Sequence, residues 1–351
     1  MNVTVVGAGA IGSVIAASLA RGGQDVLLVD GWYRHLRTIE RDGLRVETPH
    51  ETFVARPGVV HFDALEDLGT TDRLIVAVKS YDTAWVADLL RDHLAPDGIV
   101  LSAQNGMNEA TLASVFGEER TAGCVVAMGA ECFTPGHVRR TTSTDAVALL
   151  LGELRTCVTS RLRQLADLLD AVGGIELTDD IMCPMLSKLT LNVMSNPLGG
   201  LSGQSTGVMW TKPHIVDGMV ALAHEAAMVA SAAGFEMTPV LGRLDQGLLR
   251  EARTFGDDSW CRARSIIAEV GESRRDEGDH LPSLLHDVIK GRRTEIDYLN
   301  GWVVGKGREC GVPTPVNEIC VRSVHDLEIE GQPSDSRLDP LLEAALRHHG
   351  S

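Results

Sequence analysis

One lysine and two asparagines recur at every fourth position of an otherwise apolar stretch. They are Lys188, Asn192 and Asn196. In a helix these positions share one face, with a drift of about 40° per step. An ammonium and two amides make a donor-rich surface that is suited to a keto acid. An exposed polar stripe is the alternative, but it would bring the leucine, valine and methionine side chains between them near the surface, so a functional site is favoured.

Two further polar residues begin expected helices farther along the chain. Ser283 starts a segment that ends at Gly291, and Glu295 starts the next one. A hydroxyl can cap a helix, and a first-turn carboxylate can interact with the helix dipole. Each residue taken alone is therefore better explained by a structural role.

A glycine-rich turn follows the first apolar run, Val3–Val6. The turn consists of Gly7, Ala8, Gly9, Ala10, Ile11 and Gly12, and a helix-forming segment follows from Ser13. In this pattern the first glycine permits a tight turn, the second lets a pyrophosphate approach the backbone, and the third lets the helix pack on the strand. The positive end of the helix attracts the phosphates. A plain glycine-rich turn is the alternative, but the strand before it and the helix after it indicate a dinucleotide site.

Asp30 ends the second expected strand, Val26–Val29, about 18 residues after the last glycine. A carboxylate at this place can accept hydrogen bonds from the adenosine ribose. It would repel a 2′-phosphate, and the nearest arginine is Arg34. Asp30 followed by Gly31 thus favours NAD over NADP, and a helix or turn cap is the alternative.

Two later segments follow expected strands. Lys79 comes at the end of Leu74–Val78, and Asn105 with Gly106 comes after Ile99–Leu101. Ligands of such sheets bind at the carboxyl ends of the strands, so both residues could line a cofactor. A solvated loop lysine and an ordinary turn are the alternatives.

The elements that position these residues fall into two parts. In the first half, short apolar runs alternate with helix-length segments, and a last run lies at Gly123–Met128. This predicts an α/β fold with a Rossmann-type doubly wound parallel sheet. Long helical segments such as Ile215–Ala233 then predict an all-helical second domain. We place the boundary near residue 180, with a dinucleotide-binding domain at 1–180 and a substrate-binding domain at 181–351.

Two stretches of the second part are expected to be loop-rich. Residues 251–280 are charged and contain three glycines, and residues 331–340 carry two prolines among polar residues. We interpret the first as an insertion and the second as part of a carboxy-terminal extension.

Composition excludes several classes of protein. The formal charge of −16 disfavours binding to nucleic acid or anionic lipid, and the first apolar runs are too short to span a bilayer, so we expect a cytoplasmic protein. Seven scattered cysteines predict reduced, mostly buried thiols, and the 12 histidines show no ligand spacing, so no metal is expected. The sequence has no G-x-S-x-G elbow, and Gly301–Gly307 lacks the Ser/Thr of a P-loop, which argues against a hydrolase or a kinase.

Seven motifs, in order, resemble the ketopantoate reductase family across roughly residues 1–325. They are GAGAIG at 7–12, VKSYDT at 78–83, QNGM at 104–107, KLTLNVMSNPL at 188–198, SLLHDV at 283–288, TEIDYLNG at 294–301 and GVPTPVN at 311–317. So many ordered blocks make the resemblance specific.

The resemblance implies reduction of a small 2-keto acid, first of all 2-dehydropantoate, by NAD(P)H. It implies that Lys188 is the catalytic acid, and that Glu295 orients the substrate and contacts the cofactor. It assigns Asn192, Asn196 and Ser283 to the substrate. Lys79 and Asn105 would line the cofactor and substrate cleft between the domains.

Four departures from the family pattern bear on cofactor and substrate. Asp30–Gly31 replaces the basic residue of an NADP site, Leu284 and His286 stand where members commonly have Met and Gln, the stretch between the fourth and fifth motifs is longer, and the tail after 325 is extra. A hydroxyacid or opine-like dehydrogenase with another keto acid, and a non-catalytic NAD(P)-sensing protein, remain alternatives. The long apolar helices of the second domain lead us to expect a homodimer.

Overall fold

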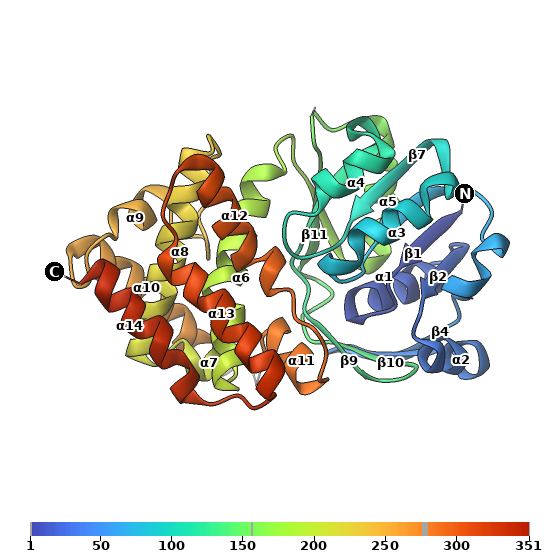
Figure 1. The fold of residues 1–351 in the computed structure, drawn as a ribbon. Helices are drawn as coiled ribbons and strands as arrows, with labels where there is room; N and C mark the ends of the chain where they lie inside the picture. Colours follow the sequence, from blue (N-terminus) through green and yellow to red (C-terminus); the bar gives the residue numbers. More distant parts are fainter. Residues whose placement is uncertain (1, 156, 276–279, 351) are drawn as a thin grey trace. The chain divides into compact units, whose positions relative to one another are not determined.

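The computed structural model describes residues 2–155, 157–275 and 280–350 (Figure 1). The chain divides into two compact units, residues 1–181 and 182–351. The division lies beside the boundary expected near residue 180. The assignment of one unit to the dinucleotide and of the other to the substrate stays a prediction.

The first unit is built on an eight-stranded sheet in the order β12-β11-β8-β7-β6-β1-β2-β5. Its strands are β1 (Val3–Val6), β2 (Val26–Asp30), β5 (Gly58–His61), β6 (Thr71–Val76), β7 (Leu94–Ser102), β8 (Thr121–Val126), β11 (Val147–Glu153) and β12 (Gly174–Leu177). Neighbours are parallel except β8 and β11. The chain runs from β1 outward through β2 and then crosses to β6 on the other side of β1, and such a switch point is where doubly wound sheets bind ligands.

Helices cover both faces of this sheet. They are α1 (Ala10–Arg21), α2 (Tyr33–Asp42), α3 (Thr83–Leu89), α4 (Glu109–Phe116) and α5 (Ser160–Leu169), with short 3-10 helices η1 (Phe62–Asp67), η2 (Ser80–Asp82), η3 (Arg91–His93), η4 (Glu118–Arg120) and η5 (Asp170–Val172). Val5 of β1 belongs to the hydrophobic cluster that includes α1 and α5, whereas Val6 belongs to the cluster of α3 and α4. Both faces of the sheet are therefore buried under helices, which explains why the strands are continuously apolar. This confirms the predicted α/β sheet.

A second, four-stranded sheet was not predicted. Its order is β4-β3-β10-β9, with β3 (Leu44–Glu47), β4 (Thr52–Ala55), β9 (Ala130–Thr134) and β10 (His137–Arg140). Only one face of these short strands is buried: Leu44 and Val46 are in the core, whereas Arg45 is exposed. Such alternation over four residues is too short to be recognised in the sequence.

The second unit is helical, as predicted. Its elements are α6 (Met182–Ser202), α7 (Thr206–Met209), α8 (Pro213–Ala232), α9 (Gln246–Glu251), α10 (Asp258–Arg275), α11 (Ser283–Ile289), η6 (Ile296–Tyr298), α12 (Asn300–Cys310), α13 (Pro315–Glu330), η7 (Asp335–Leu338) and α14 (Asp339–His349). By length and composition alone α8 could cross a membrane, but most of it is buried within the unit, as in the core helix of a globular protein.

The loop-rich interpretation of residues 251–280 was wrong for most of this stretch. Residues 258–275 form α10, and 276–279 lie outside the described residues. Trp260, Ala263 and Ile267 form a buried stripe at helical spacing. Gly271 does not break the helix, because it lies against the backbone of Trp210, 2.9 Å from where its Cβ would be, and so permits close packing on α7.

The carboxy-terminal extension is also more ordered than expected. Helical structure begins at Asp335, and α14 packs against α8 and α13. Its last residue, His349, packs on Trp260 of α10 and His224 of α8, with ring centroids 5.6 and 5.1 Å away, and its Nδ1 donates to Arg253 O at 2.9 Å. The carboxy-terminal extension therefore packs against residues of the 251–280 stretch, which was interpreted as an insertion.

The cysteines are less buried than expected. None of the seven takes part in a disulfide, but only Cys124, Cys132 and Cys320 are fully buried, and Cys157 and Cys261 are exposed.

A proline within α6 shapes the core of the second unit. Pro197 has no N–H, so the carbonyl of Val193 cannot make its usual helical hydrogen bond. Asn300, the first residue of α12, replaces the missing donor: its Nδ2 lies 3.1 Å from Val193 O and 3.0 Å from Asn317 Oδ1. The break in α6 is thus sealed by a side chain from α12.

Glu225 extends this buried network to α8 and α13. It accepts hydrogen bonds at 2.9 Å from the backbone N–H groups of Val316 and Asn317, and at 2.7 Å from Asn317 Nδ2. Desolvation raises the pKa of this carboxyl to about 7, although these hydrogen bonds lower it. The side chains of Asn300, Asn317 and Glu225 thus connect α6, α8, α12 and α13.

We expect Asn300→Ala to lower the free energy of unfolding by about 1–3 kcal/mol, because a buried carbonyl would lose its donor. Urea denaturation followed by circular dichroism measures this. Asn2→Ala, at an exposed position, is the control and should change stability by less than about 0.5 kcal/mol. An equally stable Asn300→Ala protein would show that the Val193 carbonyl finds another partner.

Candidate active site

The glycine turn of the first unit has the geometry of a phosphate-binding loop. Gly7 has a φ of +104°, and a Cβ there would lie 2.6 Å from the backbone of Ala77 and Val78, just beyond β6. A Cβ on Gly12 would collide with Gly7 O, whereas one on Gly9 would meet nothing within 4 Å. Helix α1 has no side-chain cap and no acidic residue in its first turn. The open side of Gly9 and this helix terminus fit a pyrophosphate.

A buried histidine supports the turn from behind. His35 Nδ1 accepts a hydrogen bond from Gly136 N at 2.9 Å, so Nε2 carries the proton and donates to Ser13 Oγ at 3.3 Å. Ser13 Oγ in turn donates to Ala8 O at 3.1 Å. Desolvation lowers the pKa of His35 to about 4, so the ring is neutral at physiological pH. This series of hydrogen bonds was not predicted from the sequence, because His35 and Gly136 are far from the glycine turn in the sequence.

Asp30 lies directly against the glycine turn. One carboxylate oxygen accepts from Ala8 N at 2.5 Å, and the other from Trp32 N at 2.6 Å. Desolvation raises the pKa of Asp30, and the charge of Asp82 adds to the increase. The carboxylate thus caps a turn at the end of β2. A carboxylate at this place is also suited to accept hydrogen bonds from the ribose of a bound dinucleotide.

The segments of Lys79 and Asn105 are joined by a buried hydrogen-bond network. Ser80 Oγ and Asn108 Nδ2 both donate to Asn105 O, at 3.0 and 2.8 Å. Gln104 Nε2 donates to Val78 O at 2.9 Å and to Thr83 Oγ1 at 2.8 Å. The two segments therefore form one structure at the ends of β6 and β7. Ser80 and Asn108 were not among the predicted site residues.

In the second unit, the polar face of α6 is not a solvated stripe. Asn192 and Asn196 are only 6% and 8% exposed, and Lys188 is partly buried. Asn196 Nδ2 donates to Ser283 Oγ at 3.0 Å. The exposed-stripe alternative is therefore excluded for both asparagines, and the structure brings Ser283 to this face.

Two glycines of α6 allow that approach. A Cβ on Gly199 would collide with the ring of Pro282, and one on Gly200 with the side chain of Leu284. Pro282 is the N-cap of α11, and Ser283, its first residue, makes no capping hydrogen bond. The structural interpretation of Ser283 as a cap was therefore wrong, because its hydroxyl is bonded to α6.

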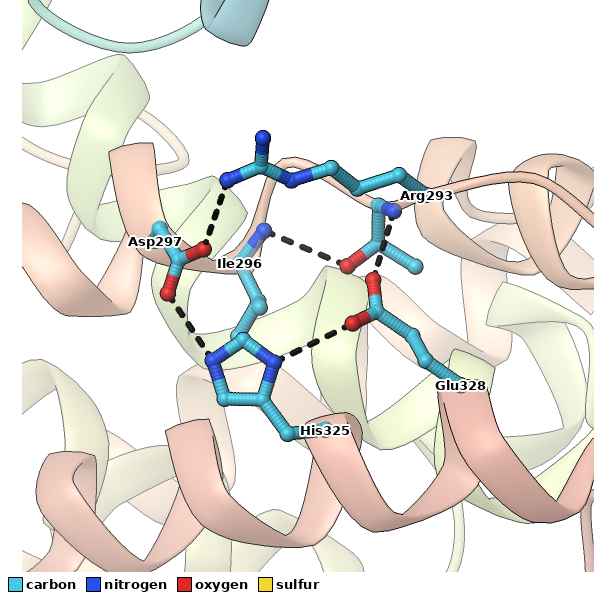
Figure 2. A network of polar contacts seen from close by, with 6 residues as sticks. Arg293, Ile296, Asp297, His325 and Glu328 are labelled. Carbon is cyan, nitrogen blue, oxygen red and sulfur yellow. Dashed lines mark hydrogen bonds and ion pairs between the residues drawn. The ribbon is translucent and has the colours of Figure 1, made fainter.

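Glu295 is 6% exposed and precedes the short helix η6, which it does not cap with its side chain. Helix α13 holds the segment around it (Figure 2): Glu328 Oε1 accepts from Thr294 N at 2.7 Å, and His325 Nε2 lies 2.9 Å from Asp297 Oδ1. The backbone on both sides of Glu295 is thus fixed by side chains.

Arg274, which sequence analysis missed, acts on Lys188 through its positive charge. Desolvation lowers the pKa of Lys188, and the positive charge of Arg274 lowers it further. The Arg274 guanidinium lies 4.8 Å above the ring of Trp210, whose Nε1 donates to Ser195 Oγ at 3.0 Å. Ser195 follows Lys188 by two helical turns and so shares its face of α6. Arg274 belongs to α10, and only the tertiary fold brings it near Lys188, so no local sequence signal could have identified it.

The predicted site residues thus form two groups, one in each unit. The glycine turn, Asp30, Lys79 and Asn105 lie at the carboxyl ends of β1, β2, β6 and β7. Lys188, Asn192, Asn196 and Ser283 lie along α6, and Glu295 lies in the segment held by α13. That the two groups form one site stays a prediction.

Comparison with known proteins decides the family. The sequence model described as "Ketopantoate reductase PanE/ApbA" matches residues 3–154, and the one described as "Ketopantoate reductase PanE/ApbA C terminal" matches residues 180–328. The chain belongs to the ketopantoate reductase family. It is an oxidoreductase that acts on a CH–OH group.

Similar proteins agree with this assignment. The chain is 29% identical over 329 residues to a 2-dehydropantoate 2-reductase from Archaeoglobus fulgidus, covering 93% of this chain and 98% of the relative. A PanE/ApbA family ketopantoate reductase from Ralstonia eutropha is 28% identical, with a TM-score of 0.76 over 95% of this chain and 100% of that one. D-mandelate dehydrogenase, solved with NADH and anilino(oxo)acetate, has a TM-score of 0.79 at 25% identity, over 94% and 99% of the two chains.

We expect Arg274→Gln to raise the pKa of Lys188, because it removes a neighbouring positive charge. An acid group loses activity as pH rises through its pKa, so the basic limb of the pH–rate profile should move to higher pH. Arg264→Gln, on the same helix but paired with Asp217, is the control. If the basic limb of the pH–rate profile does not shift in Arg274→Gln, Lys188 is not the group that transfers the proton.

Proposed function

We propose that this protein reduces a small 2-keto acid to the 2-hydroxy acid, with NADH preferred as the cofactor and 2-dehydropantoate as the leading substrate. The observation that carries the proposal is the face of α6, where Lys188 lies with the buried Asn192 and Asn196, and Asn196 is bonded to Ser283. An ammonium and two amides on one helix face suit a keto acid, because its carbonyl and carboxylate oxygens can accept hydrogen bonds from such donors.

Lys188 is the proposed general acid. A bound dihydronicotinamide supplies a hydride to the keto carbon. Lys188 Nζ then donates a proton to the carbonyl oxygen, which would otherwise become an alkoxide, so the carbonyl gains one hydride and one proton. Desolvation and Arg274 lower the pKa of Lys188, and an acid whose pKa is closer to the working pH transfers its proton more readily.

The amides and the hydroxyl orient the substrate. Asn192, Asn196 and Ser283 are positioned by α6 and α11 before substrate arrives, so little side-chain ordering remains to be done on binding. Glu295, held between Thr294 and Asp297, is proposed to orient the substrate and to contact the cofactor.

The first unit is proposed to bind the dinucleotide. The pyrophosphate would lie against Gly9 and the amino terminus of α1, and Asp30 would accept hydrogen bonds from the ribose. Lys79 and Asn105 are proposed to line the cofactor and substrate cleft. Asp30 supports NADH over NADPH because its charge would repel a 2′-phosphate.

A larger or aromatic 2-keto acid is the second candidate substrate. The observation that favours it is the likeness to D-mandelate dehydrogenase, which was solved with NADH. Leu284, one of the departures from the family pattern, packs directly on Gly200 beside Ser283. A change at this place would alter the space next to the proposed substrate residues.

We further propose that the protein acts in the cytoplasm as a homodimer. A ketopantoate reductase from Staphylococcus aureus that shares the fold, with a TM-score of 0.68 at 18% identity, is described as dimeric.

Initial rates of NADH oxidation with 2-dehydropantoate and a panel of larger 2-keto acids test the function. We expect turnover by the wild type and a loss of about 100-fold or more in kcat for Lys188→Ala, because the proton donor is removed. Lys306→Ala, which only breaks an exposed ion pair with Glu309, is the matched control.

The outcome separates the alternatives. Turnover of a larger keto acid alone would retain the mechanism and replace the substrate. Tight NADH binding without turnover of any keto acid would instead support a nucleotide-sensing protein.

Asp30→Asn tests the choice of cofactor. Removing one like charge is worth ~1.4 kcal/mol, so the preference for NADH over NADPH in kcat/KM should fall about tenfold. Asp25→Asn, an exposed position just before β2, is the control. A wild type that already prefers NADPH would contradict the role given to Asp30.

A further inference from the structure

His325 of α13 lies between two carboxylates (Figure 2). Its Nε2 is 2.9 Å from Asp297 Oδ1, and its Nδ1 is 3.1 Å from Glu328 Oε2. A neutral imidazole carries one N–H and can donate to one of these oxygens, whereas the imidazolium donates to both. The arrangement is therefore complete only when His325 is protonated.

Both carboxylates also hold the segment that carries Glu295. The second oxygen of Glu328 accepts from the backbone N–H of Thr294 at 2.7 Å, immediately before Glu295. Asp297 follows Glu295 by two residues, and its other oxygen is 3.1 Å from the Arg293 guanidinium. His325 thus connects the contacts on the two sides of Glu295 into one clamp, which consists of Arg293, Thr294, Asp297, His325 and Glu328.

The residues next to Glu295 leave this segment little freedom within the clamp. Thr294 and Ile296 are 1% and 0% exposed, and Ile296 N donates to Thr294 Oγ1 at 3.4 Å. Buried side chains such as Ile296 cannot move independently of the backbone. A loss of contacts within the clamp therefore changes the direction of the Glu295 side chain.

We infer that His325 is a positioning residue: its imidazolium, held by Asp297 and Glu328, fixes the backbone at 294–297 and so keeps the Glu295 carboxylate in place for keto-acid reduction. This rests on the proposed function, since Glu295 is there assigned to substrate and cofactor. His325 itself acts through the segment and touches neither.

The surrounding charges determine the sign of the pH effect. Burial opposes the charged ring, but the hydrogen bonds and negative charges of Glu328 on α13 and Asp297 on η6 outweigh it and raise the pKa of His325 above its ordinary value. The Arg293 guanidinium lies 3.1 Å from the other oxygen of Asp297, and its positive charge also interacts with Glu328. A raised histidine pKa means that the clamp is intact below it and is lost as pH rises through it. The catalytic rate should fall over the same range.

The test compares three proteins over pH 5–9. His325→Gln should lower kcat about 10- to 100-fold at low pH, the effect of a small displacement of an active-site group, and should remove the limb due to His325. His325→Lys keeps a positive charge that does not titrate near neutral pH, so it should restore kcat and remove the limb due to His325, leaving only the limb that moves in Arg274→Gln.

Two further measurements separate positioning from folding. Glu330→Gln, on the same helix but in an exposed pair with Arg337, should behave as the wild type. The Ile296 δ1-methyl signal, observed by NMR without substrate, should titrate with the histidine in the wild type and should not titrate in His325→Lys.

Each outcome decides. A normal pH profile and kcat in folded His325→Gln would overturn the inference, even if the protein reduces keto acids as proposed. If His325→Gln fails to fold, the Lys variant decides, because an Ile296 signal that still titrates in it overturns the clamp. If no keto acid is reduced, the proposed function fails, and the Ile296 signal judges the clamp: titration in the wild type alone supports it, and an unchanging signal overturns it.

Discussion

The missing N–H of Pro197 is the constraint on which the helical unit depends. A proline inside a helix leaves the carbonyl four residues earlier without a donor, and the carbonyl of Val193 is buried, so a donor must come from elsewhere. Asn300 provides it. Because Asn300 also binds Asn317, and Asn317 binds Glu225, one defect in α6 fixes α8, α12 and α13 around it. The polar face that carries Lys188 is consequently held by a frame of helices that cannot slide along α6 without leaving a buried carbonyl unsatisfied.

Both groups of candidate site residues depend on close backbone approach. Beyond Pro197, Gly199 and Gly200 let α11 come near enough for Ser283 to meet Asn196, since a methyl group at either glycine would collide with α11. In the first unit, Gly7 approaches the backbone at the end of β6, and Gly12 packs on Gly7 itself. Close packing of this kind places polar atoms within hydrogen-bond distance without long side chains. It therefore positions them with little loss of conformational entropy.

The sequence predicted the parts of the fold whose signal is local. Strands buried on both faces, such as β1 and β2, are continuously apolar and were found, whereas β3 and β10 have one exposed face and only four residues, and were missed. Gly271 was interpreted as a breaker because a sequence does not show that its missing side chain makes room for Trp210. The spacing of Lys188, Asn192 and Asn196 was visible in the sequence, and Ser283 and Glu295 became candidates only through the family resemblance. Arg274 and His325 carried no local signal at all, because their importance comes from which helix lies beside them.

The departures from the family pattern are distributed unequally over the two units. Asp30 is the one in the first unit, and it bears on the nucleotide. Leu284, helix α10 with Arg274, and the extension that contains His349 all belong to the helical unit, where α11 packs on α6, the charge of Arg274 acts on Lys188, and α14 packs on α10 through Trp260. Reduction of a keto acid needs a proton donor and an oriented carbonyl, and these are the roles that we propose for α6 and for the segment of Glu295. Leu284 of α11 packs on Gly200, so we expect changes there to alter substrate selection, while the groups proposed for catalysis keep the positions that Pro197 and the two glycines give them.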